Sequence, residues 1–252
     1  MLLRGHAGEH TGYVLDGAVE EDFMAGLDCV RNALPVDKDK KKTDAARRFF
    51  CAEGDKEWIR LGIVRALEES LAREEAERFE VRVLPWMRFL EYSEPNGALP
   101  PHTDALIRCK ETNAWSTHTF LVFCSDCSVG GETVLLPEEP KALRNRNRNV
   151  LKALVQAEGL RTVIARISAD GADTVRLSRL RAALEVVESR AVEESPAPGF
   201  SVQPRRGRIF FFPHACPHEG RPTVSVPKIL LRAEVILSRV DETRFSKVPG
   251  GK

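Results

Sequence analysis

Three side chains that are far apart in this sequence could meet in one metal site. His102 and Asp104 are two residues apart, so on an extended strand both side chains point to the same face of the sheet. His218 follows Asp104 by 114 residues. Two histidines and one carboxylate form the facial triad that holds Fe(II) on one side and leaves the other side open. If these residues are the ligands, the fold must bring two distant segments of the chain together.

The spacing of apolar residues predicts helices near the N-terminus and short strands after them. Apolar residues recur every three or four positions over 21–34 and again over 56–78, as on one face of a helix. From residue 79 onward, alternating, β-branched and aromatic residues predict short strands instead. We expect these strands at 79–83, 87–92, 117–123, 132–136, 207–213 and 229–237. Helices followed by many short strands indicate a mainly β fold with helices, of the α+β class, as a sandwich or barrel.

Residues 138–199 interrupt the strand pattern and are predicted to be an insertion. Within it, 141–182 contains ten lysines and arginines but only three acidic residues, so this stretch is strongly basic. The apolar spacing over 174–192 predicts a helix, although a hairpin around Asp170-Gly171 also fits the residues before it.

The length of the chain suits one large domain, and we expect residues 1–252 to form one. Its expected parts are helical support at 1–78, a core made of 79–137 and 200–240, and the basic insertion at 138–199.

The overall composition favours a protein of a reducing, aqueous compartment. The net charge is only +1, so the charge balance gives no reason to expect nucleic acid as a partner. The first residues lack the apolar run of a secretory signal, and no stretch approaches the roughly 20 apolar residues that span a membrane. The six cysteines are scattered, which favours free thiols. We therefore expect a cytoplasmic or nuclear protein without a membrane segment.

Five motifs follow one another along the chain. They are YSEPNGALPPHTD at 92–104, THTFLVFCSDC at 117–127, GGET at 130–133, PRRGRIFFFPHACPHEG at 204–220 and PKILLR at 227–232. In their order and spacing they resemble the catalytic core of Fe(II)/2-oxoglutarate-dependent dioxygenases, specifically the prolyl-4-hydroxylase-like branch. The resemblance implies a double-stranded β-helix (jelly-roll) core. It also implies that Fe(II), 2-oxoglutarate and O2, with ascorbate as a further candidate, support hydroxylation of a C–H bond and release of succinate.

The resemblance assigns the metal ligands by position. His102, Asp104 and His218 match the iron ligands of the family, and they are also our candidate catalytic residues. His214 lies four residues before His218 and is the alternative distal ligand; the step of ten residues from His218 to the lysine of PKILLR favours His218. His118 lies in an apolar run, where a hydrogen-bonded strand histidine is the favoured interpretation.

The resemblance also assigns residues to the co-substrate. Lys228 matches the basic residue that pairs with the far carboxylate of 2-oxoglutarate, and Tyr92 matches a tyrosine that hydrogen-bonds it in some members. A buried ammonium without its anion is destabilised by lost hydration, so Lys228 is expected to need that carboxylate. Arg232 is four residues further on, on the same strand face as Lys228, and is the second candidate for the same role.

The sequence leaves the substrate open. The first hypothesis is hydroxylation of a protein or peptide residue, prolyl being the best-known target of the family. The second is the same chemistry on a small molecule or an alkylated nucleic-acid base, and the third is a non-catalytic jelly-roll binding protein. Only the basic stretch 141–182 suits nucleic acid, and it lacks aromatic residues on which bases could stack. A protein, peptide or small-molecule substrate is therefore favoured, and the complete triad argues against the non-catalytic alternative.

Overall fold

The computed structural model shows an antiparallel β fold with helices. It describes residues 2–7, 10–37, 44–74, 79–137, 156–157, 159–166, 168, 174–193 and 199–239. The chain divides into two compact units, 1–137 with 199–252, and 138–198. The first unit contains the candidate site and most of the regular structure.

The larger sheet of the first unit has eight strands, all joined by antiparallel pairs. In spatial order they are β1 (Leu2–Ala7), β2 (His10–Leu15), β10 (Ile209–Pro213), β7 (His118–Phe123), β12 (Lys228–Arg239), β5 (Trp86–Tyr92) and β3 (Ala46–Cys51), with β4 (Phe79–Val83) paired to the end of β12. The smaller sheet has the order β6 (Leu99–His102), β11 (His218–Gly220), β8 (Thr133–Leu135) and β9 (Phe200–Val202). Both sheets mix strands from the two halves of the sequence, which is how distant residues come together.

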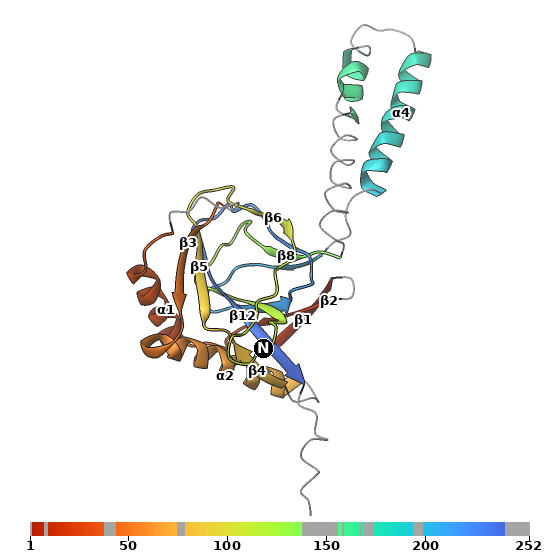
Figure 1. Cartoon of the computed structure of the whole chain (residues 1–252). Helices are drawn as coiled ribbons and strands as arrows, with labels where there is room; N and C mark the ends of the chain where they lie inside the picture. Colours follow the sequence, from red (N-terminus) through yellow and green to blue (C-terminus); the bar gives the residue numbers. More distant parts are fainter. Residues whose placement is uncertain are drawn as a thin grey trace, which may run out of the picture. The chain divides into compact units, whose positions relative to one another are not determined.

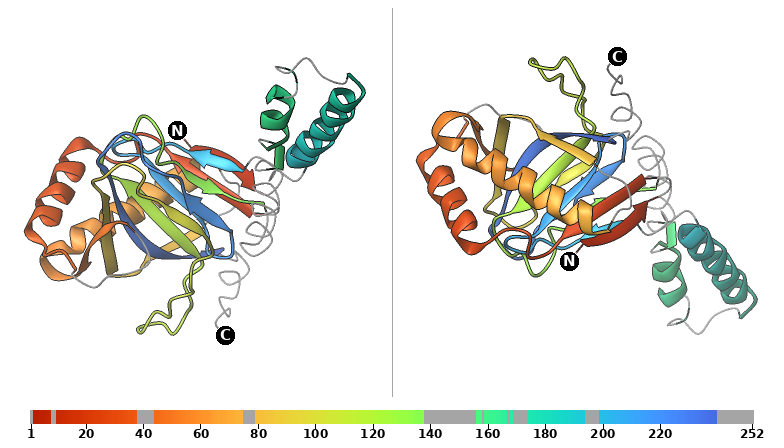
Figure 2. Two further views of the ribbon diagram at one scale, coloured as in Figure 1. Left: turned by 90° about the horizontal axis from the view of Figure 1, so that it is seen from above. Right: turned by 90° about the horizontal axis from the view of Figure 1, so that it is seen from below.

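Two helices cover the outer face of the larger sheet, as Figure 2 shows. These are α1 (Glu21–Ala33) and α2 (Glu57–Glu74), with a short 3-10 turn, η1 (Gly54–Lys56), before α2. Leu27 of α1 and Ile63 of α2 are fully buried and belong to the same apolar cluster as Phe89 and Leu231 of the sheet. Because strand residues alternate between faces, the odd-numbered residues of β12 near Leu231 face these helices, and the even-numbered ones face inward.

The inner face of the larger sheet packs against the smaller sheet (Figure 1). Phe210 and Phe212 of β10, Leu121 of β7 and Leu230 of β12 form a second apolar cluster with Leu135 of the smaller sheet. Two facing antiparallel sheets supported by helices agree with the predicted mainly β fold with a jelly-roll core, which is thereby confirmed.

The structure matches most of the expected elements and adds six short strands, β1, β2, β3, β6, β9 and β11. The helices predicted at 21–34 and 56–78 correspond to α1 and α2, and each expected strand overlaps an observed one. The segment 1–78, expected to be helical, also contains the β1–β2 hairpin and the edge strand β3. Gly5 and Gly12 interrupt the side-chain pattern of that hairpin; Gly5 leaves room for the ring of Phe200, and Gly12 leaves room for Leu135.

The second unit is described only in part. α4 (Thr174–Glu193) confirms the helix predicted over 174–192. Residues 138–155, and with them part of the basic stretch 141–182, lie outside the described residues. None of the helices that the structure describes combines the length and the apolar character needed to cross a membrane.

Candidate metal site

His102 and His218 are brought together by strand pairing. His102 ends β6, His218 begins β11, and the two are direct partners in the register of this antiparallel pair. Their ring centroids are 4.2 Å apart. Asp104 lies two residues beyond the end of β6, and its backbone N–H donates to the carbonyl of His214 at 3.3 Å. The smaller sheet therefore carries both histidines and the start of the loop that holds the carboxylate.

The three side chains present their possible ligand atoms to one point. Nε2 of His102 is 3.6 Å from Oδ1 of Asp104, and Nε2 of His218 is 3.5 Å from Oδ2. All three ligand atoms lie within 4.8 Å of one another. Atoms bound to one ion at roughly 2 Å are separated by roughly 3 to 4 Å, so this arrangement fits a single metal ion.

The two histidine rings are oriented as metal ligands require. Nδ1 of His102 lies 2.9 Å from the carbonyl of Pro100, and Nδ1 of His218 lies 3.0 Å from the carbonyl of Cys216. A carbonyl oxygen only accepts, so Nδ1 must carry the proton and Nε2 keeps its lone pair. Burial lowers the pKa of His218 to about 4, which keeps this imidazole neutral at physiological pH. Neutral imidazole is the form that binds a metal.

Two side chains of the larger sheet, Thr119 and Arg232, bind the carboxylate of Asp104. The hydroxyl of Thr119 donates to Oδ2 at 2.5 Å, and Nη2 of Arg232 lies 2.7 Å from Oδ1. Burial alone would raise the pKa of Asp104, but His102, Arg232 and His218 together hold it well below the usual range. The carboxylate is therefore charged and fixed in orientation.

The two other histidines considered as ligands, His214 and His118, have other partners. His214 is buried behind Asp104, where Nδ1 donates to the hydroxyl of Thr119 at 3.0 Å and Nε2 lies 2.8 Å from the hydroxyl of Ser116. His118 lies on β7 with Nδ1 2.8 Å from the hydroxyl of Thr117. Neither belongs to the convergent set, and His214 supports Asp104 through Thr119.

We expect Thr119→Val to weaken divalent-metal binding by about 10- to 100-fold, the usual effect of removing an outer hydrogen-bond partner of a ligand. The substitution keeps the shape of the side chain but removes the donor to Asp104 and the acceptor for His214. Titration calorimetry with Mn(II) measures the affinity. Thr11→Val, on the β1–β2 hairpin, is the matched control. Equal affinities in Thr119→Val and wild type would show that Asp104 does not depend on this hydroxyl.

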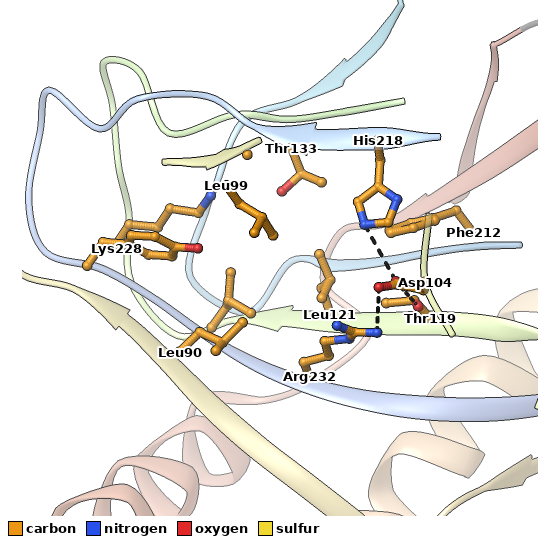
Figure 3. A pocket seen from close by; sticks show the side chains of 13 residues that line it. Leu90, Leu99, Asp104, Thr119, Leu121, Thr133, Phe212, His218, Lys228 and Arg232 are labelled. Carbon is orange, nitrogen blue, oxygen red and sulfur yellow. Dashed lines mark hydrogen bonds and ion pairs between the residues drawn. The ribbon is translucent and has the colours of Figure 1, made fainter. Parts of the chain in front are cut away.

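A cavity extends from these residues to Lys228. Its walls carry leucines from both sheets, among them Leu90, Leu99 and Leu121. Figure 3 shows Asp104 and His218 at one end of it and Lys228 at the other. An apolar wall between two charged ends suits a short molecule with an anionic group at each end.

Lys228 is a buried amine that forms no ion pair with any residue the structure describes. Its side chain is only 3% exposed, and its Nζ lies 5.3 Å from the ring centroid of Tyr92, its partner in the register of β5 and β12. Among the described residues, none makes a hydrogen bond or an ion pair with this amine. Burial lowers the pKa of Lys228 to about 8, partly offset by Cys127 and Glu132. Such an amine is stabilised by an anion that enters the cavity.

Arg232 lies near Asp104 rather than near Lys228. Its guanidinium contacts Asp104 and, at 3.1 Å, Oε1 of Glu234. Of the two cationic candidates for the far carboxylate of a co-substrate, Lys228 is thus at the far end of the cavity and Arg232 beside the metal ligands.

Without ligand, the stability of the wild type should rise with pH relative to Lys228→Met. The amine has a pKa of about 8 when folded and 10.5 as a free lysine, so between these values the unfolded chain binds more protons. The difference in unfolding free energy between the two proteins should change by up to ~3 kcal/mol across this window, at about 1.4 kcal/mol per pKa unit. Urea unfolding at several pH values measures it. A constant difference would mean that Lys228 is not desolvated in the free protein.

Several supporting residues were not predicted from the sequence. These are Thr119, His214 as a support of Asp104, and Glu234. A usable signal existed in β12, where Arg232 and Glu234 alternate with apolar residues in a strand that is otherwise buried. Charged residues at every second position of a buried strand indicate a polar site on one of its faces.

Comparison with known proteins supports the fold. No protein-family model matches the sequence, and no curated protein matches it. HygX from Streptomyces hygroscopicus, solved with nickel and 2-oxoglutarate bound, is similar with a TM-score of 0.50 and 11% identity, over 89% of this chain and 82% of that chain. This likeness shows that the two proteins share a fold, which agrees with the predicted jelly-roll core.

Two further solved structures are similar with lower scores. An oxidoreductase of the 2OG-Fe(II) oxygenase family from Burkholderia pseudomallei has a TM-score of 0.49 and 12% identity, over 89% of this chain and 83% of that chain. The viral collagen prolyl hydroxylase of Paramecium Bursaria Chlorella virus-1 has a TM-score of 0.45 and 12% identity, over 92% of this chain and 96% of that chain.

Proposed function

We propose that this protein is an Fe(II)- and 2-oxoglutarate-dependent dioxygenase that hydroxylates a C–H bond, with succinate and CO2 as co-products. One observation carries the proposal. A cavity has three convergent metal-ligand atoms at one end and, at the other, a buried amine that none of the described side chains pairs with. A dicarboxylate that binds a metal through one end and an ammonium through the other fits this arrangement.

The residues of the chain would each have a defined task. Nε2 of His102, a carboxylate oxygen of Asp104 and Nε2 of His218 would hold Fe(II) and leave its other positions for ligands. The metal and 2-oxoglutarate, with O2, supply the oxidising chemistry. Lys228 would pair with the far carboxylate through a charge-assisted hydrogen bond.

The cavity walls would orient the co-substrate and exclude water. Leu90, Leu121 and Leu230 would pack along its carbon chain, and Tyr92, which lines the cavity beside Lys228, would contact the same end. Burial raises the pKa of Tyr92 to about 12, so its phenol stays protonated and can act as a hydrogen-bond donor.

The substrate proposed from the resemblance is a protein or peptide residue of the prolyl-hydroxylase type, with a small molecule as the alternative. That HygX, of similar fold, was solved with nickel and 2-oxoglutarate supports the co-substrate part of the proposal. Which of these two classes of substrate the protein accepts would depend on what the surface beside the metal site can bind.

The direct test is succinate production from 2-oxoglutarate by the purified protein. We expect it to require Fe(II) and O2, to stop when a chelator is added, and to rise when a substrate is present in a panel of peptides and metabolites. Parallel reactions with and without ascorbate show whether it sustains turnover. A well-folded, iron-loaded protein that neither binds nor consumes 2-oxoglutarate would exclude this function and favour a non-catalytic binding role.

A further inference from the structure

A row of side chains on the inner face of the larger sheet leads away from the candidate metal site. Arg88 of β5 is the direct strand partner of Arg232, and Phe49 of β3 is the direct partner of Arg88. Directly paired residues of antiparallel strands lie on the same face, about 5 Å apart. Trp86 is on this face too, two residues before Arg88. The row therefore runs from Asp104 through Arg232 and Arg88 to the edge strand.

The outer end of this row is open. Trp86 is 64% exposed and Phe49 is 41% exposed, although both are large aromatic residues in strands. Their neighbours on the opposite face, Phe50 and Met87, are buried beneath the helices. In the direction of Lys228, by contrast, the inner-face residues Leu90, Tyr92 and Leu230 are buried. Exposed aromatic residues beside a half-covered site are typical of a ligand-binding surface.

The guanidinium of Arg88 makes no direct ion pair with a carboxylate of the described residues, although the charges of Glu234 and Asp104 act on it. In the part of the chain that the structure describes, its side chain makes no hydrogen bond and no ion pair, whereas its neighbour Arg232 contacts both Asp104 and Glu234. Burial lowers the pKa of Arg88 to about 10; the charges of Arg232 and Arg47 act in the same direction, and those of Glu234 and Asp104 oppose them. The guanidinium is still protonated at neutral pH. A half-buried cation that has two like charges nearby and no direct ion pair gains stability when an anion binds it.

We propose that Arg88, Phe49 and Trp86 form a substrate subsite for a carboxylate or phosphate carried on a flat apolar group. The planar guanidinium can bind either oxyanion with two parallel hydrogen bonds, and the rings provide surfaces for the apolar group. The subsite rests on the proposed function, since it adjoins the metal that would carry out the reaction. It is separate from the co-substrate cavity, whose lining contains Arg232 and Lys228 but not Arg88.

The position of the subsite restricts the substrate. Arg88 is one strand, about 5 Å, from Arg232, and Arg232 touches the proposed ligand Asp104. A reactive carbon above the metal would therefore be only a few bonds from the anchored anion. This short distance favours a compact acid or an acidic side chain as the substrate. The carbon that is oxidised would lie near the charged end of that substrate.

Fragment binding tests the subsite. The protein is loaded with Mn(II) and saturating 2-oxoglutarate and then titrated with benzoate, phenyl phosphate and benzyl alcohol, followed by NMR. We expect at least one of the two anions to bind with a dissociation constant of roughly 1 mM, as suits a fragment, and benzyl alcohol to bind much more weakly. The two anions distinguish a carboxylate from a phosphate substrate.

Variants connect this binding to the proposed residues. Arg88→Gln should weaken anion binding at least tenfold and leave the affinity for 2-oxoglutarate unchanged. Arg88→Lys should bind the anions more tightly than Arg88→Gln but more weakly than the wild type. Phe49→Ala should weaken the aryl anions about threefold, as expected for the loss of one ring contact. Arg82→Gln, an exposed arginine of β4 with the same change of charge, is the matched control.

Three results would overturn the subsite: no binding of either anion, equal binding of benzyl alcohol, or a parallel loss of 2-oxoglutarate affinity in Arg88→Gln. The last result would assign Arg88 to the co-substrate. If 2-oxoglutarate itself does not bind, the same titrations are run without it. Anion binding that still depends on Arg88 would then retain the subsite while the proposed function fails.

Discussion

His218→Ala is expected to abolish Fe(II)-dependent succinate formation and to weaken divalent-metal binding by more than about 100-fold. Loss of an outer hydrogen-bond partner alone costs about 10- to 100-fold, and this variant removes a ligand atom. It leaves only Nε2 of His102 and the carboxylate of Asp104 facing the site. Calorimetric titration with Mn(II) gives the affinity, and succinate is measured in the same preparation.

His6→Ala is the matched control, because His6 is exposed on β1 and hydrogen-bonds only Thr11 among its described neighbours. It should keep full metal affinity. If His218→Ala binds Mn(II) like the wild type while His214→Ala does not, the distal ligand is His214 and the assignment of His218 is wrong.

The second large effect is expected for Lys228→Met, which should raise the dissociation constant of 2-oxoglutarate by about 10- to 100-fold. A hydrogen bond between charged groups contributes about 1.5–3 kcal/mol, and the buried position of the amine leaves the carboxylate no water to replace it. Metal affinity should not change, because the amine lies at the end of the cavity opposite Asp104. Calorimetry with 2-oxoglutarate on Mn(II)-loaded protein measures the first affinity, and titration of the metal-free protein with Mn(II) measures the second.

Lys110→Met, which removes an exposed lysine, is the control for the change of net charge. Arg232→Gln separates the two candidate anchors. If it weakens 2-oxoglutarate binding and Lys228→Met does not, Arg232 holds the far carboxylate and the orientation of the co-substrate in the cavity is reversed.

Much of this fold could be predicted because its signals are local. Apolar residues every three or four positions indicated α1 and α2, and short alternating runs indicated the strands of the core. The β1–β2 hairpin was not predicted because Gly5 and Gly12, which make room for Phe200 and Leu135, break its side-chain pattern. β3 escaped because its residues Ala46–Cys51 include two arginines directly after a charged loop. In both cases a contact with a distant strand determines the structure.

Prediction of the candidate site from the sequence was limited in the same way, because local patterns do not encode contacts between distant segments. Spacing along a strand correctly places Arg232 on the face of Lys228, but four residues of strand extend about 13 Å. Arg232 therefore reaches Asp104 while Lys228 reaches the other end of the cavity. Thr119 and His214 could not be assigned, because their roles depend on β7 and on the loop after β10 meeting Asp104, which no local pattern encodes.

A crystal structure of the protein grown with Mn(II) and 2-oxoglutarate tests the central claim most directly. We expect one metal ion bound by Nε2 of His102, a carboxylate oxygen of Asp104 and Nε2 of His218, each at roughly 2 Å. We expect 2-oxoglutarate to chelate that ion and to place its far carboxylate against Nζ of Lys228. A cavity that stays empty under these conditions, or a metal ion bound by other side chains, would contradict the account.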